Sequence, residues 1–200
     1  MQVVKVGGSL LSHARDLMEL LNNYDVLVVP GGGVFADAVR KVYKSHALSE
    51  KAAHSMAILA MCQYGTLLSD ISDIEAVESL EEVHAPCIFL PYNLMSRSSA
   101  LEPSWDVTSD TIACYIAKEL NAERFVILTD VGGIYLHGKI LERISAEELS
   151  RYGETCVDRG LPRCLLENKM NCLVVDGGDL EKVKRAMEGE ETGTLIIGGE

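Results

Sequence analysis

Residues 26–33 read Val26-Leu27-Val28-Val29-Pro30-Gly31-Gly32-Gly33, an apolar run followed at once by three glycines. Four consecutive apolar residues between Asp25 and Pro30 predict a strand that is buried on both faces, as in a parallel sheet. The glycines then predict a turn into a helix from Phe35 to about Lys44. This succession of strand, glycine turn and helix is the repeating unit of an α/β fold.

The same succession recurs along the chain. Further apolar strands are expected at 3–6, 125–128, 172–175 and 194–197, with shorter ones near 74–77, 87–90 and 139–141. Helices are expected at 10–21, 49–68, 110–120, 179–188 and, briefly, from Ser145, and a loop rich in serine and proline at 96–104. No internal repeat or linker divides the chain. The pattern predicts a three-layer α/β/α sandwich with a mostly parallel central sheet, formed by residues 1–200 as one domain.

Composition and charge restrict the class of protein. The chain has 200 residues, of which 48% are hydrophobic and 24% charged, and its formal net charge is −12. So acidic a surface argues against nucleic acid or an anionic membrane as the partner, but it allows a local phosphate site. No apolar run is long enough to span a membrane and no leader-like segment opens the chain, so a cytoplasmic protein is expected.

The six cysteines point to no special chemistry. None forms a Cys-x-x-Cys pair, and most lie inside apolar runs such as Ile112-Ala113-Cys114-Tyr115. Buried, reduced thiols are the expectation, with neither a disulfide framework nor a metal site built by the protein itself.

Glycine turns mark the expected binding site. Four strands end in one: Gly7-Gly8-Ser9, Gly31-Gly32-Gly33, Asp130-Val131-Gly132-Gly133 and Asp176-Gly177-Gly178. Ligands of open α/β sheets bind at the carboxyl ends of the strands, where glycines let the backbone approach an anion and helix N-termini supply N–H donors. The same glycines could be plain connectors, but two such turns in the first 35 residues favour phosphate binding.

Several common enzyme classes lack support in this sequence. It contains no G-x-x-x-x-G-K-[ST] and no G-x-G-x-x-G after a strand, which disfavours a P-loop enzyme and a dinucleotide-dependent oxidoreductase. It also lacks G-x-S-x-G and H-E-x-x-H, which disfavours an α/β hydrolase and a zincin. Lys5, in contrast, lies on a buried strand directly before a glycine turn, and an unpaired buried lysine is costly unless it has a function.

An ordered set of motifs resembles the amino-acid kinase superfamily, which includes acetylglutamate, aspartate, uridylate and isopentenyl phosphate kinases. The set is Lys5-Val6-Gly7-Gly8-Ser9, Pro30-Gly31-Gly32-Gly33, Thr108-Ser109-Asp110-Thr111 and Leu128-Thr129-Asp130-Val131-Gly132-Gly133-Ile134-Tyr135. The resemblance spans nearly the whole chain. It implies phosphoryl transfer from ATP, with Mg²⁺, to a small molecule, and it implies a homo-oligomer.

The resemblance also implies roles for individual residues. The transferring phosphoryl group is expected at Lys5, Gly7, Gly8 and Ser9, with Asp110 orienting the catalytic lysine. The acceptor is expected at Gly31, Gly32 and Gly33. The nucleotide is expected at Thr129, Asp130, Gly133, Tyr135 and Lys139.

Some of these residues have a plain structural alternative. Asp110 could simply be an acidic residue in the first turn of a helix, where the helix dipole stabilises it. Asp130 could be a turn former, and Lys139 a solvated hairpin lysine.

One part of the family pattern is missing. Many members have Gly-Gly-Met followed by a phosphate-binding lysine late in the chain, where this chain reads Val157-Asp158-Arg159-Gly160-Leu161-Pro162-Arg163. Arg163 is the expected substitute for that lysine. Arg159 is an alternative that the sequence does not separate from it, and Lys169 is a weaker third candidate.

Three further stretches, 53–61, 105–110 and 156–162, resemble an archaeal group of this family that converts a furan phosphomonoester to its diphosphate. Such an acceptor would require a phosphate contact beside Gly32 and Gly33, from His54 or Arg97, and a flat surface for the ring, from Trp105 or Tyr92. Its ammonium would require Asp37 or Asp106. Packing roles for His54 and Trp105 remain alternatives. The rival functions are another acceptor (isoprenoid phosphate, carboxylate or carbamate) and a non-catalytic nucleotide or oxyanion binder.

Overall fold

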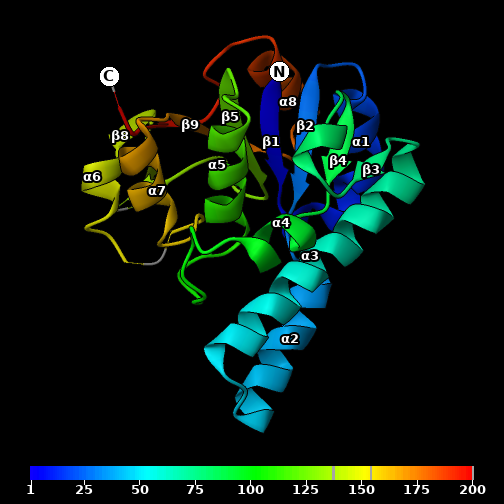
Figure 1. The fold of residues 1–200 in the computed structure, drawn as a ribbon. Coiled ribbons are helices and arrows are strands. Elements are labelled where there is room, and N and C mark those ends of the chain that lie inside the picture. The colour runs from blue at the N-terminus through cyan, green and yellow to red at the C-terminus, as the bar shows by residue number, and fades with distance from the viewer. Residues whose placement is uncertain (137, 154, 200) are drawn as a thin grey trace.

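A computed structural model describes residues 1–136, 138–153 and 155–199 (Figure 1). The strands are β1 (Gln2–Val6), β2 (Val26–Pro30), β3 (Ala76–Val77), β4 (Cys87–Phe89), β5 (Arg124–Thr129), β6 (Tyr135–Leu136), β7 (Lys139–Ile140), β8 (Arg143–Ser145), β9 (Cys172–Asp176) and β10 (Thr194–Ile197). The α-helices are α1 (Ala14–Leu21), α2 (Gly33–His46), α3 (Glu50–Ser72), α4 (Tyr92–Arg97), α5 (Ser109–Glu119), α6 (Ala146–Leu149), α7 (Leu161–Asn168) and α8 (Leu180–Met187). Two 3₁₀ helices, η1 (Gly8–His13) and η2 (Leu80–Glu82), complete the elements described.

The main sheet has eight strands in the order β3-β4-β2-β1-β5-β9-β10-β8. Every neighbouring pair is parallel except β9 and β10, which run antiparallel. Strands β6 and β7 form a separate small hairpin. A large, mostly parallel sheet between helices confirms the predicted α/β class, because strands enclosed by helices on both faces can be apolar throughout.

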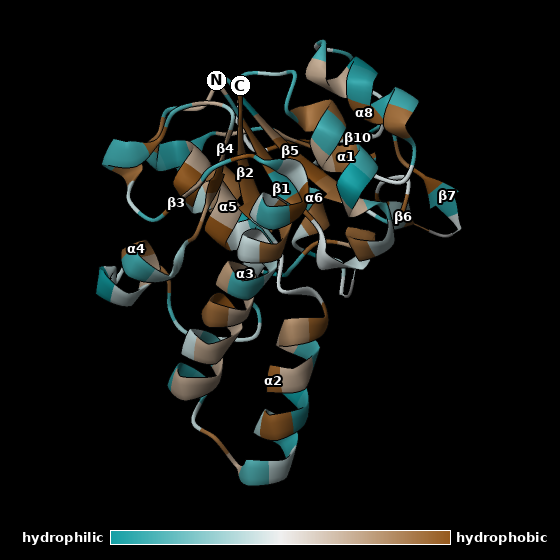
Figure 2. Cartoon of the chain, turned by 90° about the vertical axis from the view of Figure 1, so that its right-hand side faces the viewer, coloured by the Kyte–Doolittle hydropathy of each residue, from teal (hydrophilic) through white to brown (hydrophobic). Residues whose placement is uncertain are grey.

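Alternation along β1 assigns each side chain to one face of the sheet. Val3 belongs to the hydrophobic cluster that includes α5, α6 and α7, and Val4 and Val6 belong to the cluster that includes α1 and α8. Because successive side chains of a strand point to opposite faces, Lys5 lies on the α5 side with Val3. The apolar strands form the brown centre of Figure 2.

Helices α2 and α3 form a long hairpin that projects from the sheet (Figures 1 and 2). Ser49 begins the second arm as predicted, and its Oγ accepts a hydrogen bond from the Ala52 N–H at 3.2 Å. The first arm of the hairpin starts directly at Gly33, so the base of the hairpin lies at the carboxyl end of β2.

The differences from the predicted elements are local. The first helix opens as 3₁₀ turns at Gly8 before α1 begins, and β3 keeps only two residues of the expected strand. Two short α-helices were not predicted. One is α4, which reaches Arg97 at the edge of the expected loop, and the other is α7, whose first turn contains Pro162. Both are eight residues or fewer, too short for apolar periodicity to stand out.

Candidate active site

At the carboxyl edge of the sheet, three of the four glycine turns donate a backbone hydrogen bond to the end of a neighbouring strand. The N–H of Gly7 donates to Leu128 O at 2.9 Å, and the N–H of Gly31 donates to Val6 O at 2.8 Å. The N–H of Gly177, in the fourth turn, donates to Thr129 O at 2.7 Å. The ends of β1, β2, β5 and β9 are therefore joined edge to edge, which gives a rigid floor for a ligand.

The first two glycine turns touch each other. A Cβ atom on Gly8 would overlap the Cα and N of Gly33, and Gly33 itself has a positive φ of +50°. Glycine is therefore required at position 8 for close packing and at position 33 for backbone conformation. Helices η1 and α2 start at these same glycines, so their first N–H groups, which have no acceptor inside their own helix, lie beside one cleft.

A buried ion pair lies at the end of β1. Lys5 is 8% exposed and Asp110, in the first turn of α5, is 4% exposed. Lys5 Nζ lies 2.7 Å from Asp110 Oδ1. The pair is a charge contact rather than an aligned hydrogen bond, and Asp110 Oδ1 has no hydrogen-bond donor among the described residues. Buried charges are tolerated when they are paired, and this pair keeps an ammonium group at the wall of the cleft.

The cleft above this pair has a volume of about 720 Å³. It brings together six of the residues predicted for the phosphoryl and acceptor sites: Lys5, Gly8, Ser9, Gly32, Gly33 and Asp110. Its rim carries Ser12, Asp37 and Arg40, and its other wall is formed by Thr108 and Ser109. A lysine, several hydroxyl groups and two glycine backbones around an open cleft suit a polyanionic ligand.

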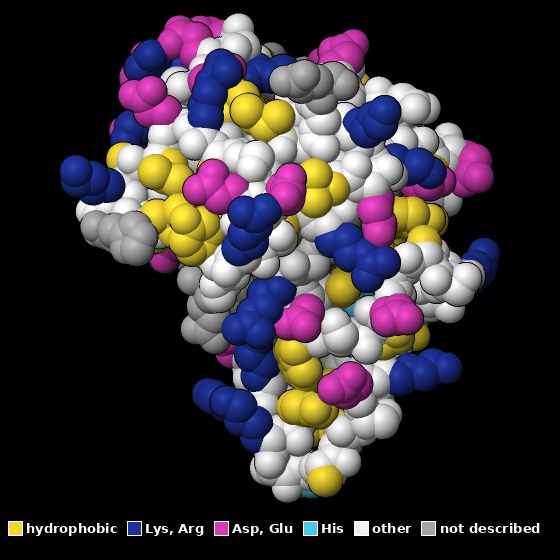
Figure 3. Space-filling model, turned by 90° about the vertical axis from the view of Figure 1, so that its left-hand side faces the viewer, with side chains coloured by type: hydrophobic (Ala, Val, Ile, Leu, Met, Phe, Trp, Pro, Cys, Tyr) yellow, Lys and Arg dark blue, Asp and Glu magenta, His cyan; other side chains and the backbone are white. Residues whose placement is uncertain are grey.

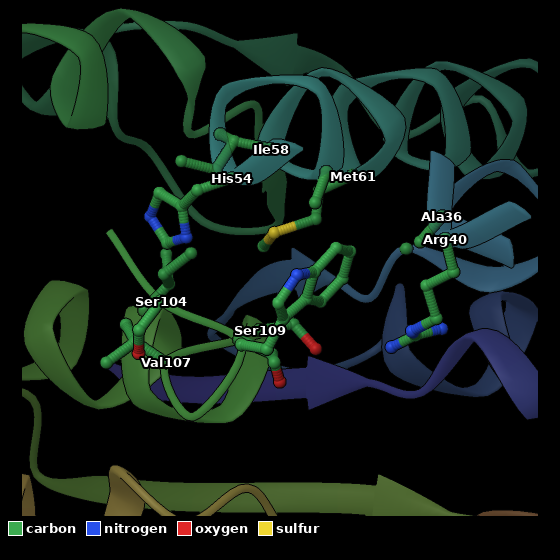
Figure 4. A pocket seen from close by; sticks show the side chains of 13 residues that line it. Ala36, Arg40, His54, Ile58, Met61, Ser104, Val107 and Ser109 are labelled. Atoms are coloured by element: carbon green, nitrogen blue, oxygen red, sulfur yellow. The ribbon is translucent and has the colours of Figure 1, made fainter. Parts of the chain in front are cut away.

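A smaller pocket of about 60 Å³ continues from the cleft and shares Gly32, Ala36, Arg40, Thr108 and Ser109 with it. Its remaining lining residues are His54, Ala57, Ile58, Met61, Ser104, Trp105, Val107 and Ile112. In Figure 4, Arg40 and His54 lie on opposite sides of this pocket and Met61 points in between them. The site is thus polar on the cleft side and mainly apolar on the pocket side.

Trp105 both packs and lines this pocket. Its ring lies 5.3 Å from the ring of Tyr43, and the guanidinium carbon of Arg40 lies 5.6 Å from its centroid. Its indole Nε1 is buried and has no hydrogen-bond partner among the described residues. Burial lowers the pKa of His54, across the pocket, and a backbone hydrogen bond at Ser104 partly offsets that shift. His54 is therefore held toward its neutral form.

Residues predicted for the nucleotide divide into two groups. Gly7, Thr129 and Asp130 lie at the sheet edge, where the Thr129 Oγ1 donates to Asp130 Oδ1 at 3.2 Å. Gly133, Tyr135 and Lys139 lie further along, at and within the β6–β7 hairpin, where Tyr135 is 54% exposed. An exposed aromatic ring beside a sheet edge is a suitable surface for a base, although neither group lines the cleft described above.

Arg163 does not reach the cleft. Its side chain is 83% exposed on α7 and pairs with Glu167 one turn away, with Nε 2.7 Å from Oε1. Arg159 borders a different pocket, with Arg151 and Tyr152, and Lys169 ends α7 in a left-handed conformation. Arg97 and Tyr92, on α4, and Asp106 also lie outside the lining of the cleft and its pocket.

Arg40 is the basic residue that sequence reasoning missed. It lines both the cleft and the pocket, and its Nη1 pairs with Asp37 Oδ1 at 2.8 Å. The signal was available, because Arg40 lies four residues after Ala36 and seven after Gly33, on one face of a helix. Figure 3 shows basic side chains (dark blue) along the lower part of the molecule, and α2 itself contributes Arg40, Lys41 and Lys44.

Comparisons with known proteins identify the family of this chain. Residues 93–176 match the model of the amino acid kinase family. A [5-(aminomethyl)furan-3-yl]methyl phosphate kinase from Methanocaldococcus jannaschii is 36% identical over 99% of this chain and 98% of its own length. A uridylate kinase from Methanothrix thermoacetophila is 26% identical over 97% of this chain and 98% of its own.

Solved structures show the same fold. The crystal structure of uridylate kinase from Archaeoglobus fulgidus superposes with a TM-score of 0.75 at 22% identity, over 98% of this chain and 100% of that one. The crystal structure of UMP kinase from Bacillus anthracis superposes with a TM-score of 0.75 at 16% identity, over 100% of this chain and 96% of that one. Within the described residues, no helix is long and apolar enough to cross a membrane. The chain is an ATP-dependent phosphotransferase that belongs to the amino acid kinase family.

Proposed function

We propose that this kinase transfers the γ-phosphoryl group of ATP to the phosphate of a small phosphomonoester, with [5-(aminomethyl)furan-3-yl]methyl phosphate as the favoured acceptor. In this reaction an oxygen of the acceptor phosphate forms a bond to the γ-phosphorus, the bond to the ADP oxygen breaks, and a diphosphate and ADP result. The observation that carries the proposal is the junction at Arg40, where a polar cleft for phosphates opens into a small apolar pocket.

Lys5 is the proposed catalytic residue. Phosphoryl transfer depends mainly on positioning and on stabilising charge that spreads over the equatorial oxygens. Lys5 presents its ammonium at the cleft beside Gly8 and Ser9, and Asp110 fixes it by the 2.7 Å contact. Gly8 and Gly33 both line the cleft, and because they carry no side chain a phosphate oxygen can approach their backbone.

The nucleotide is proposed to bind along the edge from Gly7 to Thr129 and Asp130, with its base toward Tyr135 and Lys139 on the hairpin. The floor of hydrogen-bonded turns supports this placement, because it leads directly from the cleft to β5. Mg²⁺ would be held by the phosphates of ATP and would supply neutralisation of their charge.

The acceptor is proposed to place its phosphate at Arg40, Gly32 and Gly33 and its ring in the pocket. Arg40 presents a planar guanidinium suited to a phosphate. Its partner Asp37 is exposed, so a phosphate can replace Asp37 as the partner of Arg40. The buried indole N–H of Trp105, without a partner in the described chain, is available to an oxygen atom of the ligand. A pocket of about 60 Å³ favours a single small ring over a nucleoside. Of the two carboxylates considered for the ammonium, Asp37 lines the cleft.

Three broader expectations accompany this function. We propose that residues 1–200 act as one amino-acid-kinase domain, that the protein works in the cytoplasm, and that it self-associates. The net charge of −12 supports a small-molecule partner rather than nucleic acid.

A panel of acceptors tests the proposal. Purified protein with ATP and Mg²⁺ is offered the furan phosphate, UMP, isopentenyl phosphate and N-acetylglutamate, and ADP release is measured. Turnover of the furan phosphate, with a KM raised in Arg40→Gln, is the expected result. Turnover of a carboxylate alone would exclude a phosphomonoester acceptor. ATP binding without any turnover would identify a non-catalytic nucleotide binder.

A further inference from the structure

Asp158 lies outside the cleft and has an unusually full set of hydrogen bonds. Its Oδ2 accepts from the backbone N–H of Thr108 at 2.9 Å, the Thr108 hydroxyl at 2.8 Å and the N–H of Thr111 at 3.0 Å. Its Oδ1 accepts from the Thr111 hydroxyl at 2.5 Å and the N–H of Leu161 at 2.9 Å. One carboxylate therefore joins the start of α5 to the start of α7, two helices from distant parts of the chain.

Asp158 is also linked to the buried ion pair. Its backbone N–H donates to Asp110 Oδ2 at 3.0 Å, while the other oxygen of Asp110 contacts Lys5. The Asp110 carboxylate is thus held at both oxygens, by a backbone N–H on one side and by the catalytic ammonium on the other. Any movement of residue 158 changes the direction in which Asp110 faces Lys5.

A charged side chain at position 158 carries a desolvation cost. Burial raises the pKa of Asp158, the nearby Asp110 raises it further, and hydrogen bonds from Thr111 and Thr108 oppose both effects. A serine, threonine or asparagine can cap a helix without placing a second carboxylate beside Asp110. Five converging donors compensate an anion better than a neutral group, so the arrangement favours a fixed carboxylate over simple capping.

We propose that Asp158 is a positioning residue for phosphoryl transfer: it fixes the Thr108–Thr111 segment, and through it holds Asp110 and Lys5 in their working geometry. The segment matters twice, because Thr108 and Ser109 also form the wall shared by the cleft and the acceptor pocket. This inference rests on the proposed function of the same site. It adds Asp158, a second carboxylate, as a third member of the group that the family resemblance limits to Lys5 and Asp110.

The test uses Asp158→Asn, which keeps the size of the side chain and removes its charge. An amide places an NH₂ among groups that are all donors, so the segment is expected to shift. We expect kcat to fall on the order of 10- to 100-fold, because small misplacements of reacting groups have effects of this size. The dissociation constant for ATP should change little, because Thr108 and Ser109 line the acceptor pocket and do not belong to the edge of Gly7, Thr129 and Asp130 that is proposed for the nucleotide. The matched control is Asp179→Asn, which alters an aspartate cap on α8, on the opposite face of the sheet.

A second variant and a second readout keep the test decisive. If Asp158→Asn does not fold, Thr111→Val is used instead. It removes one hydroxyl donor to Asp158 and leaves every charge in place, and it should also lower kcat. Trp105 is the only tryptophan in the chain and lies three residues before Thr108, so its fluorescence reports on the segment itself. Its emission should change in Asp158→Asn and stay unchanged in Asp179→Asn.

The outcomes separate this inference from the proposed function. A kcat loss in Asp158→Asn no larger than that of the Asp179→Asn control would overturn the positioning role. If the wild-type protein turns over no acceptor, the proposed function fails, and the Trp105 emission still decides about Asp158. Unchanged emission in that case refutes the positioning role, and changed emission supports it.

Discussion

Replacing Lys5 with methionine should separate the proposed catalytic role of the buried ion pair from its structural role. Lys5 and Asp110 are both less than a tenth exposed and lie 2.7 Å apart. Methionine fills most of the lysine volume but leaves Asp110 as an unpaired buried carboxylate. Breaking a buried pair in this way costs about 3–5 kcal/mol of unfolding free energy. For a chain of this length the melting temperature should fall by about 6–20 °C.

The loss of activity should follow a different rule. Removing one preorganised donor to the transferring group lowers kcat by about 10²–10³-fold. In Lys5→Met/Asp110→Asn the stranded carboxylate is gone as well, so about 2 kcal/mol of the lost stability should return. The activity should not return, because the ammonium is still missing. Urea denaturation measures the first effect, and ADP release under saturating ATP measures the second.

The double variant decides between the two roles. If Lys5 were only a structural partner for Asp110, the double variant would regain activity together with stability. That result, or a Lys5→Met protein that folds and turns over at close to the wild-type rate, would refute the assignment of Lys5 as catalytic. Stability restored without activity would support it.

Three further predictions concern the glycine turns, the hairpin and the acceptor pocket. Gly8→Ala should abolish activity and lower the melting temperature, because its Cβ would overlap Gly33, whereas Gly153→Ala, with open space around the Cβ, should change neither quantity. Ser49→Ala should lower the unfolding free energy by about 1 kcal/mol in urea denaturation and leave kcat unchanged, because it removes only the cap of α3. Burial lowers the pKa of His54, so on acidification through about pH 6.5 the unfolded chain takes up a proton before the folded one does. The wild type should therefore lose stability more steeply than His54→Gln as the pH falls through that range, and equal slopes in urea titrations at several pH values would contradict this.

The fold could be predicted because its evidence is local. Four apolar residues from Val26 to Val29 cannot face water on either side, so a strand enclosed by helices follows from the run alone. Glycine turns after such strands also mark the carboxyl edge without knowledge of the strand order. What the sequence could not supply was the order itself, including the antiparallel pairing of β9 with β10. That pairing joins residues such as Leu173 and Leu195, which are distant along the chain, so no local pattern specifies it.

The candidate site was predicted in part for the same reason. Lys5 could be singled out because a lysine on a buried strand needs a partner, and the alternation of β1 turns it toward the face that α5 covers. Asp158 could not be singled out, because its five donors come from Thr108, Thr111 and Leu161. Those residues are about 50 positions away or part of a helix that was not predicted, and no spacing rule brings them together.

Arg163 and Arg40 show what a family resemblance can and cannot predict about a side chain. Arg163 stands where the family resemblance expects a lysine, but the buried positions of α7 are 161, 162, 164 and 165, so residue 163 faces solvent. Arg40 had no counterpart in the expected pattern, yet helical phase from Gly33 and Ala36 places it at the cleft. A resemblance transfers the order of residues along the chain, whereas the direction of a helical side chain is set by which face that helix buries. The basic residue that lines the cleft is therefore found by helical phase rather than by order along the chain, and that reasoning selects Arg40.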